Sequence, residues 1–116
     1  MICLAPTPLH LLPRLSQHLD IQLFVKRDDL FPYTGGGNKA RKIVNIIEEA
    51  AKTGCNALLT TGGLQSNHAR VVALAAAERG WRCGLVLHGS RYEASPPKGN
   101  LLLMALTGAE ITVVEP

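Results

Sequence analysis

Two glycine-rich segments carry the residues of this chain that could do chemistry. The first, residues 35–42, reads Gly-Gly-Gly-Asn-Lys-Ala-Arg-Lys and follows a charged corner, Lys-Arg-Asp-Asp-Leu, at residues 26–30. The second, residues 62–68, reads Gly-Gly-Leu-Gln-Ser-Asn-His. Each segment leads into a predicted helix, whose first backbone N–H groups lack partners within the helix. One turn offers the amine of Lys39, and the other offers a hydroxyl and an amide.

Three interpretations of Lys39 have to be weighed. A phosphate-binding loop would have Ser or Thr directly after the lysine, and Ala40 stands there, so we set this interpretation aside. A solvated first-turn lysine is the ordinary structural interpretation, although a cation at that position opposes the helix dipole. Surroundings that disfavour the ammonium would leave a neutral amine, which Schiff-base formation requires. The spacing alone favours neither of the last two, but together with the second turn it suggests an enzyme that forms a Schiff base.

The second turn also has a structural and a functional interpretation. The two glycines and Ser66 could simply form a tight turn and a helix cap, which is the commonest meaning of such residues. Alternatively, Ser66, Asn67 and the exposed N–H groups form an anion site for a substrate carboxylate. Gln65 adds hydrogen-bonding capacity to that site. His68 could carry a proton, although a lone histidine at a helix start more often has a structural role.

The elements that would position these turns alternate along the chain. Apolar runs predict strands at residues 21–25, 57–61, 82–88 and 110–114. Helical spacing of apolar residues, with a glycine after each segment, predicts helices at about 39–53, 67–79 and 98–106. We expect Asn38 to cap the first of these helices, and Ser66 or Asn67 to cap the second.

This alternation indicates an α/β unit with a mostly parallel sheet and helical crossovers. The strands are continuously apolar, which is expected when helices cover both faces of a sheet. In such sheets ligands bind beyond the carboxyl ends of the strands. Both glycine-rich turns are predicted to lie there, so position and chemistry agree.

The composition is that of one soluble globular domain. The chain has 116 residues, with 47% hydrophobic and 18% charged residues, which argues against disorder. The net charge is +3, and the 12 basic residues are mixed with 9 acidic ones along the chain, so we expect no nucleic-acid partner. We expect no membrane span and no signal peptide. Cys3, Cys55 and Cys83 form no disulfide framework and no metal site, which fits the reducing cytoplasm.

Several motifs then make the chain recognisable. They are Pro-Thr-Pro-Leu at 6–9, the corner at 26–30, and the segments at 35–42, 62–70 and 99–103, the last reading Gly-Asn-Leu-Leu-Leu. Together they resemble the aminocyclopropane-carboxylate deaminase / D-cysteine desulfhydrase family over nearly the whole chain. The resemblance implies pyridoxal 5′-phosphate as the cofactor. It also implies a three-layer, mostly parallel α/β sheet of the tryptophan-synthase-β-like kind, known as fold-type II.

The resemblance assigns roles to five residues. Lys39 would be the catalytic Schiff-base lysine that holds the cofactor, and Asn67 would bond the cofactor's phenolic oxygen. Ser66 would bind the substrate carboxylate together with Gln65 and would be a candidate nucleophile or proton relay. His68 would lie in the substrate site, and a histidine there is closer to the desulfhydrases than to the deaminases, which more often carry Gln. The family further implies a small amino acid as substrate and a homo-oligomer, a dimer in the complete enzyme.

The chain is much shorter than family members and is expected to be a truncated piece. It lacks the later glycine-rich loop that grips the cofactor phosphate, the partner of the pyridine nitrogen and a downstream tyrosine. We expect residues 1–40 to begin the large cofactor-binding domain and residues 41–116 to form most of the small Rossmann-like domain. Two functions stay open at this point. One is a lyase or deaminase most like D-cysteine desulfhydrase, with aminocyclopropane-carboxylate deaminase as the other substrate class, and the second is a non-catalytic α/β domain of the same ancestry.

Overall fold

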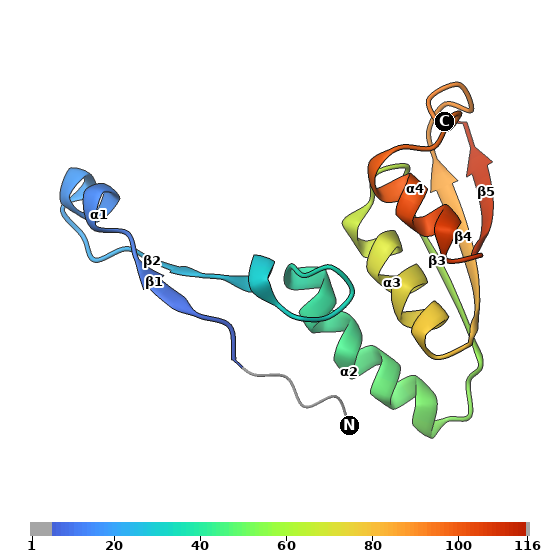
Figure 1. Ribbon diagram of the computed structural model, residues 1–116, viewed down its shortest axis with the longest axis horizontal. Coiled ribbons are helices and arrows are strands. Elements are labelled where there is room, and N and C mark those ends of the chain that lie inside the picture. The colour runs from blue at the N-terminus through green and yellow to red at the C-terminus, as the bar shows by residue number, and fades with distance from the viewer. Residues whose placement is uncertain (1–5, 116) are drawn as a thin grey trace.

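The chain forms an extended N-terminal arm followed by an α/β unit, as Figure 1 shows. The computed structural model describes residues 6–115, so Cys3 lies outside the described residues. The elements in chain order are β1 (Leu9–Leu11), α1 (Pro13–Leu19), β2 (Phe24–Lys26), the short 3-10 helix η1 (Asp28–Leu30), α2 (Asn38–Lys52), β3 (Ala57–Gly63), α3 (Asn67–Glu78), β4 (Arg82–His88), α4 (Gly99–Leu106) and β5 (Glu110–Val114). No helix of residues 6–115 combines the length and the apolar character that crossing a bilayer requires.

A three-stranded parallel sheet in the order β3-β4-β5 forms the centre of the α/β unit. Its strands pair so that their carboxyl ends lie level, with Gly63 opposite His88 and His88 opposite Val114. The predicted bounds of β4 and β5 are confirmed, whereas β3 continues two residues further, to Gly63. The predicted α/β class with a parallel sheet and helical crossovers is therefore confirmed.

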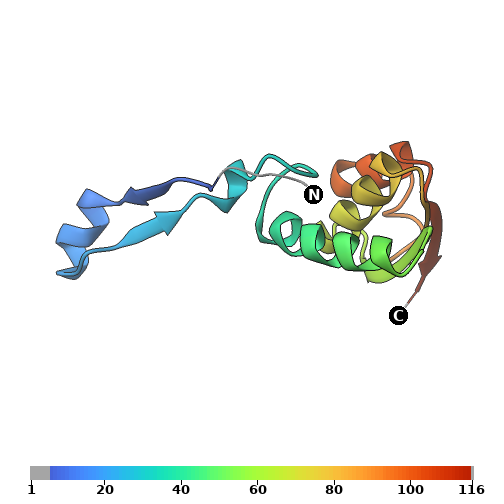
Figure 2. The ribbon, with the colours of Figure 1, turned by 90° about the horizontal axis from the view of Figure 1, so that it is seen from below.

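The core lies between this sheet and helices α2, α3 and α4, which Figure 2 shows gathered on one side of it. Inward side chains of β4, Leu85 and Leu87, are almost completely buried. Full burial of a leucine contributes about 2 kcal/mol to the free energy of unfolding. Helix α3 meets the sheet with fully buried alanines, Ala69, Ala73 and Ala76. Such small side chains let the helix axis approach the strands closely, which brings the start of α3 next to the end of β3.

The opposite face of the sheet is open in the part of the chain that the structure describes. Burial alternates along β4, and Val86 on the outward face is 37% exposed, while Leu59 of β3 is 77% exposed. The continuous apolar runs predicted helices on both faces, but the helices of residues 6–115 cover one face only. The outward apolar residues explain why the strands read as apolar throughout.

The N-terminal arm is an antiparallel hairpin that carries α1 between its two strands. The predicted strand at residues 21–25 was placed too early, because β2 begins at Phe24. The physical reason is that the N–H groups of Ile21 and Leu23 donate to the carbonyl and hydroxyl of Ser16 and so close α1. Helix α1 was not predicted, and it buries no residue.

We expect the 116-residue chain to associate with itself through the open face of the sheet, because exposed contiguous apolar surface favours association. Leu59→Asn should shift the chain toward the monomer in sedimentation velocity experiments. Leu106, which is 75% exposed on α4, provides the control. Leu106→Asn should leave the association unchanged, and a wild-type chain that sediments as a monomer at all concentrations would contradict the prediction.

Candidate active site

The lysine turn is shaped by three consecutive glycines with positive φ angles of 80°, 77° and 91° at residues 35–37. Gly37 holds the cap position of α2, so the prediction that Asn38 caps this helix is wrong, and Asn38 is the first helical residue. The reason is that the Gly37 N–H donates to the carbonyl of Asp28 (2.6 Å), which fixes the turn before the helix begins. Lys39 follows in the first turn of α2, half-buried.

A cluster that we call the corner clamp, formed by Thr7, Asp28 and Arg41, holds this turn in place. The Arg41 guanidinium donates to both oxygens of the Asp28 carboxylate, with Nη2–Oδ1 at 2.6 Å and Nε–Oδ2 at 3.0 Å. Arg41 Nη2 also donates to Thr7 Oγ1 (2.8 Å), which in turn donates to Asp28 Oδ1 (3.0 Å). The guanidinium lies over the Phe31 ring, 4.7 Å from its centroid. Because Arg41 is two residues from Lys39, the clamp also fixes the helical turn that carries the lysine.

The second turn starts α3. Ser66 caps this helix, which confirms one of the two predicted caps, Ser66 or Asn67. Its Oγ accepts a hydrogen bond from the Ala69 N–H (3.1 Å). An added Cβ at Gly62 would lie 2.6 Å from Ser66 Oγ, so the turn requires glycine at the end of β3. Because the cap uses Oγ as an acceptor, the hydroxyl of Ser66 keeps its hydrogen for donation.

The two turns meet in a cleft of about 210 Å³ beyond the carboxyl end of β3. Its lining residues are Asp29, Gly35, Gly36, Gly37, Asn38, Lys39, Asn67 and Arg70. The cleft therefore brings Lys39 and Asn67 together. Among the described residues, Gln65, Ser66 and His68 do not line it.

Arg70 of α3 connects the two turns and was not singled out from the sequence. Its Nη2 donates to the carbonyl of Gly36 (3.2 Å), so a side chain of the second turn's helix holds the first turn. Its Nε is buried and has no hydrogen-bond partner within the described residues. The only signal for Arg70 in the sequence was its place at the end of the motif at 62–70.

Gln65 does not face the cleft but binds the start of α4. Its Oε1 accepts from the backbone N–H of Asn100 (2.9 Å), and its Nε2 donates to the carbonyl of Lys98 (3.0 Å). Both ends of the amide that was expected to hold a substrate carboxylate are thus engaged within the protein. The Asn100 side chain donates to the carbonyl of Gln65 (2.9 Å) and to Oδ1 of Asn67 (3.0 Å). The only signal for Asn100 in the sequence is its place in the motif at 99–103.

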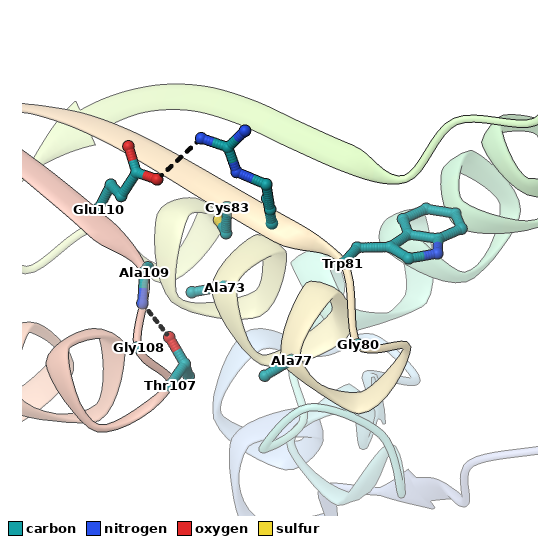
Figure 3. A pocket seen from close by; sticks show the side chains of 10 residues that line it. Ala73, Ala77, Gly80, Trp81, Cys83, Thr107, Gly108, Ala109 and Glu110 are labelled. Carbon is teal, nitrogen blue, oxygen red and sulfur yellow. Dashed lines mark hydrogen bonds and ion pairs between the residues drawn. The ribbon is translucent and has the colours of Figure 1, made fainter.

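A second cavity, of about 240 Å³ and shown in Figure 3, lies at the amino ends of β4 and β5. An ion pair between Arg82 and Glu110 (3.1 Å) crosses its rim. Cys83 lines it, and burial raises the pKa of this thiol, which disfavours the reactive thiolate. None of the residues predicted to do chemistry lies there, so we place the site at the opposite end of the sheet.

The fold and the cleft define an α/β protein that presents a lysine amine and hydrogen-bond donors beyond the carboxyl end of a parallel strand. Comparison with known proteins agrees, since the family model described as "Pyridoxal-phosphate dependent enzyme" matches residues 2–116. The chain belongs to this family of pyridoxal-phosphate-dependent enzymes.

Relatives and solved structures narrow the resemblance. The chain is 42% identical over 114 residues to a D-cysteine desulfhydrase of Klebsiella pneumoniae subsp. pneumoniae, and this match covers 96% of the chain. It is 40% identical to D-cysteine desulfhydrase of Salmonella newport. The crystal structure of an ACC deaminase homologue superposes with a TM-score of 0.84 at 37% identity over 95% of the chain and 33% of that structure. A pyridoxal 5′-phosphate-dependent aspartate racemase, 24% identical with a TM-score of 0.76 over 97% of the chain and 34% of that structure, shares the fold. The chain spans 35% of the length of the Klebsiella relative.

We expect Gly36→Ala to lower the free energy of unfolding by about 3 kcal/mol, because a Cβ there would collide with the carbonyl oxygen of Asp29 in a conformation that L-residues avoid. Gly54 provides a matched control, with a φ of +76° and nothing within 4 Å of an added Cβ. Gly54→Ala should cost about 1 kcal/mol in the same urea denaturation experiment. Equal losses in the two variants would show that the approach to Asp29 does not matter.

The corner clamp also predicts a pH dependence. The hydrogen bond from Arg41 lowers the pKa of Asp28 in the folded protein. The stabilisation that it contributes is present above the unfolded-state pKa of about 4 and is lost as the pH falls through the folded-state pKa. Asp28→Asn should therefore be less stable than the wild type at neutral pH, and the difference should shrink on acidification.

Urea denaturation over a series of pH values measures this difference. Asp20→Asn removes the same charge from an exposed residue and serves as the control. A difference between wild type and Asp28→Asn that stays constant down to the lowest pH would contradict the clamp.

Proposed function

We propose that the protein to which this chain belongs is a pyridoxal-phosphate-dependent lyase that acts on a small amino acid, most like a D-cysteine desulfhydrase that releases sulfide and ammonia. The observation that carries the proposal is the cleft beyond β3 that both Lys39 and Asn67 line. The 42% identity to a D-cysteine desulfhydrase supports this choice of substrate.

The donors around the cleft fit the reactive end of pyridoxal phosphate. An amine complements its aldehyde, and the amide of Asn67 complements its phenolic oxygen. Arg70 adds a positive charge, and its buried Nε still lacks a hydrogen-bond partner within the described residues. We assign the grip on the phosphate group to no residue of this chain, so we expect the 116-residue chain alone to bind the cofactor weakly.

Each residue of the two turns then has a part in the chemistry. When bound, pyridoxal phosphate supplies an electron sink for the pair released at the substrate α-carbon. Lys39 Nζ would hold the cofactor, and as a free amine the same Nζ would take the α-proton of the substrate. Ser66, which caps α3, donates its remaining hydroxyl hydrogen to the substrate carboxylate near the free N–H groups of the helix start. His68 lies half-buried one residue after Asn67, where we propose that it borders the substrate.

The role of Gln65 follows from its contacts. Because both ends of its amide bind the start of α4, we propose that Gln65 supports the substrate site by holding the turn rather than by binding the carboxylate through its side chain. The backbone of the neighbouring residue, Ser66, is then held in place when the substrate binds.

The remaining features of the whole protein are proposals of the same kind. The hairpin sheet β1-β2 is separate from the parallel sheet, which supports a division into the start of a large domain at residues 1–40 and most of a small domain at residues 41–116. We propose a homo-oligomer that works in the cytoplasm. Aminocyclopropane-carboxylate deaminase is the alternative activity, supported by the 37% identity to the deaminase homologue. The other alternative is a non-catalytic domain of the same ancestry. Covalent attachment of the cofactor to Lys39, tested below, would exclude it.

In the whole protein to which this chain belongs, Lys39→Ala should abolish covalent attachment of the cofactor, seen as the loss of the visible absorbance that borohydride bleaches in the wild type, and should abolish release of sulfide from D-cysteine. The physical reason is that alanine offers no amine to the aldehyde. Mass spectrometry of the reduced wild-type protein should place the cofactor on the peptide that contains Lys39.

Lys42 lies exposed on the same helix and provides the control. Lys42→Ala should retain both the attached cofactor and the sulfide release. Attachment to another lysine in the wild type, or undiminished attachment in Lys39→Ala, would reject the assignment, and a wild type that never binds cofactor would favour the non-catalytic domain.

A further inference from the structure

The start of α4 contributes a third segment to the site, through Asn100. We propose that Asn100 is a positioning residue that fixes the orientation of the Asn67 amide, so that Asn67 presents its Nδ2 donor, and not its oxygen, to the cleft. The inference rests on the proposed role of Asn67 toward the cofactor. It adds a residue from a different helix, Asn100 of α4, which does not line the cleft.

The orientation of both amides follows from a backbone atom. The carbonyl oxygen of Gln65 can only accept, so the Asn100 atom that lies 2.9 Å from it must be the donor Nδ2. The same Nδ2 lies 3.0 Å from the Asn67 side chain, which must therefore turn its acceptor Oδ1 toward Asn100. Since an amide has one oxygen and one NH₂ group, the Nδ2 of Asn67 is the group left for the cleft.

Asn100 is itself held at its backbone. Its N–H donates to Oε1 of Gln65 (2.9 Å), and the other end of that amide donates to the carbonyl of Lys98 (3.0 Å). The orientation of the Gln65 amide is thus fixed by a backbone donor at one end and a backbone acceptor at the other. Gly99 makes this approach possible, because its φ is +55° and an added Cβ would lie 2.5 Å from Oε1 of Gln65.

The orientation of the Asn67 amide decides whether a positive or a negative partial charge faces the cleft. An NH₂ group directed at the cleft attracts an anionic oxygen, whereas a carbonyl oxygen in the same place repels it. A freely rotating amide would offer both, and would have to be ordered when a ligand binds. Asn100 therefore selects the orientation that suits an anionic oxygen before the ligand arrives.

Two substitutions at position 100 separate positioning from mere packing. Asn100→Ala removes the donor and frees the Asn67 amide. Asn100→Asp keeps the shape but replaces the donor by an acceptor, so the Asn67 amide should reverse and turn its oxygen to the cleft. We expect the dissociation constant for pyridoxal phosphate, measured by absorbance titration of the whole protein to which this chain belongs, to rise about fivefold in Asn100→Ala and at least about tenfold in Asn100→Asp.

The decisive measurement is a double-mutant cycle with Asn67→Ala. If Asn100 acts through Asn67, neither substitution at position 100 should weaken cofactor binding further once the Asn67 amide is gone. In cofactor-free protein, the side-chain ¹⁵N–¹H resonances of Asn67 should also shift in both variants. Asn45, exposed on α2, supplies the matched control, and Asn45→Asp should change neither the dissociation constant nor those resonances.

The possible outcomes distinguish this inference from the function on which it rests. If Asn67→Ala leaves cofactor binding unchanged, the proposed role of Asn67 fails and the inference falls with it. If Asn67→Ala weakens binding but the variants at position 100 do not, the proposed function stands and the inference is overturned. Equal and additive losses in the wild-type and Asn67→Ala backgrounds would assign Asn100 a purely structural part and also overturn it.

Discussion

The ion pair between Asp28 and Arg41 joins the charged corner to the first turn of α2, and the geometry of the site depends on it. Its two short hydrogen bonds hold the charged corner against the first turn of α2, and Thr7 ties the start of the arm to the same guanidinium. A bidentate pair of this kind fixes direction as well as distance. The three glycines between the corner and α2 follow from this constraint, because the chain must reverse within a few residues that lie against the backbone of Asp28 and Asp29.

The second turn is held by side chains that bind backbone atoms. Arg70 binds the carbonyl of Gly36, and Gln65 and Asn100 bind each other's backbone across the start of α4. Backbone partners cannot rotate away, so the side chains that face the cleft are oriented before any ligand binds. The result is a cleft lined by four residues whose side chains can donate hydrogen bonds, Asn38, Lys39, Asn67 and Arg70, and by the single carboxylate of Asp29. Such a balance suits an anionic ligand with an electrophilic carbon.

The chain exposes apolar surfaces to water, which is unfavourable in free energy. The outward face of the sheet exposes Leu59 and Val86, and the arm exposes Phe24 and other apolar side chains. In larger α/β proteins a further layer buries apolar sheet faces of this kind. The chain spans 35% of the length of the Klebsiella relative. The core between the sheet and its helices is nevertheless well formed, and it places the two turns at one end.

The sequence by itself determined the alternation of strands and helices, because apolar spacing and glycine stops are local signals, and β4 and β5 lie where the apolar runs predicted them. It also identified both glycine-rich turns, while the roles of Lys39, Ser66, Asn67, Gln65 and His68 came from family resemblance and stay predictions. The cap of α2 was missed because a contact from Asp28, nine residues away, decides it. Only the tertiary structure showed that Lys39 and Asn67 share a cleft, that Gln65 turns to α4, and that Arg70 and Asn100 support the turns. These features depend on which distant side chains and backbone atoms come together, and no periodicity along the chain encodes which atom a side chain will reach.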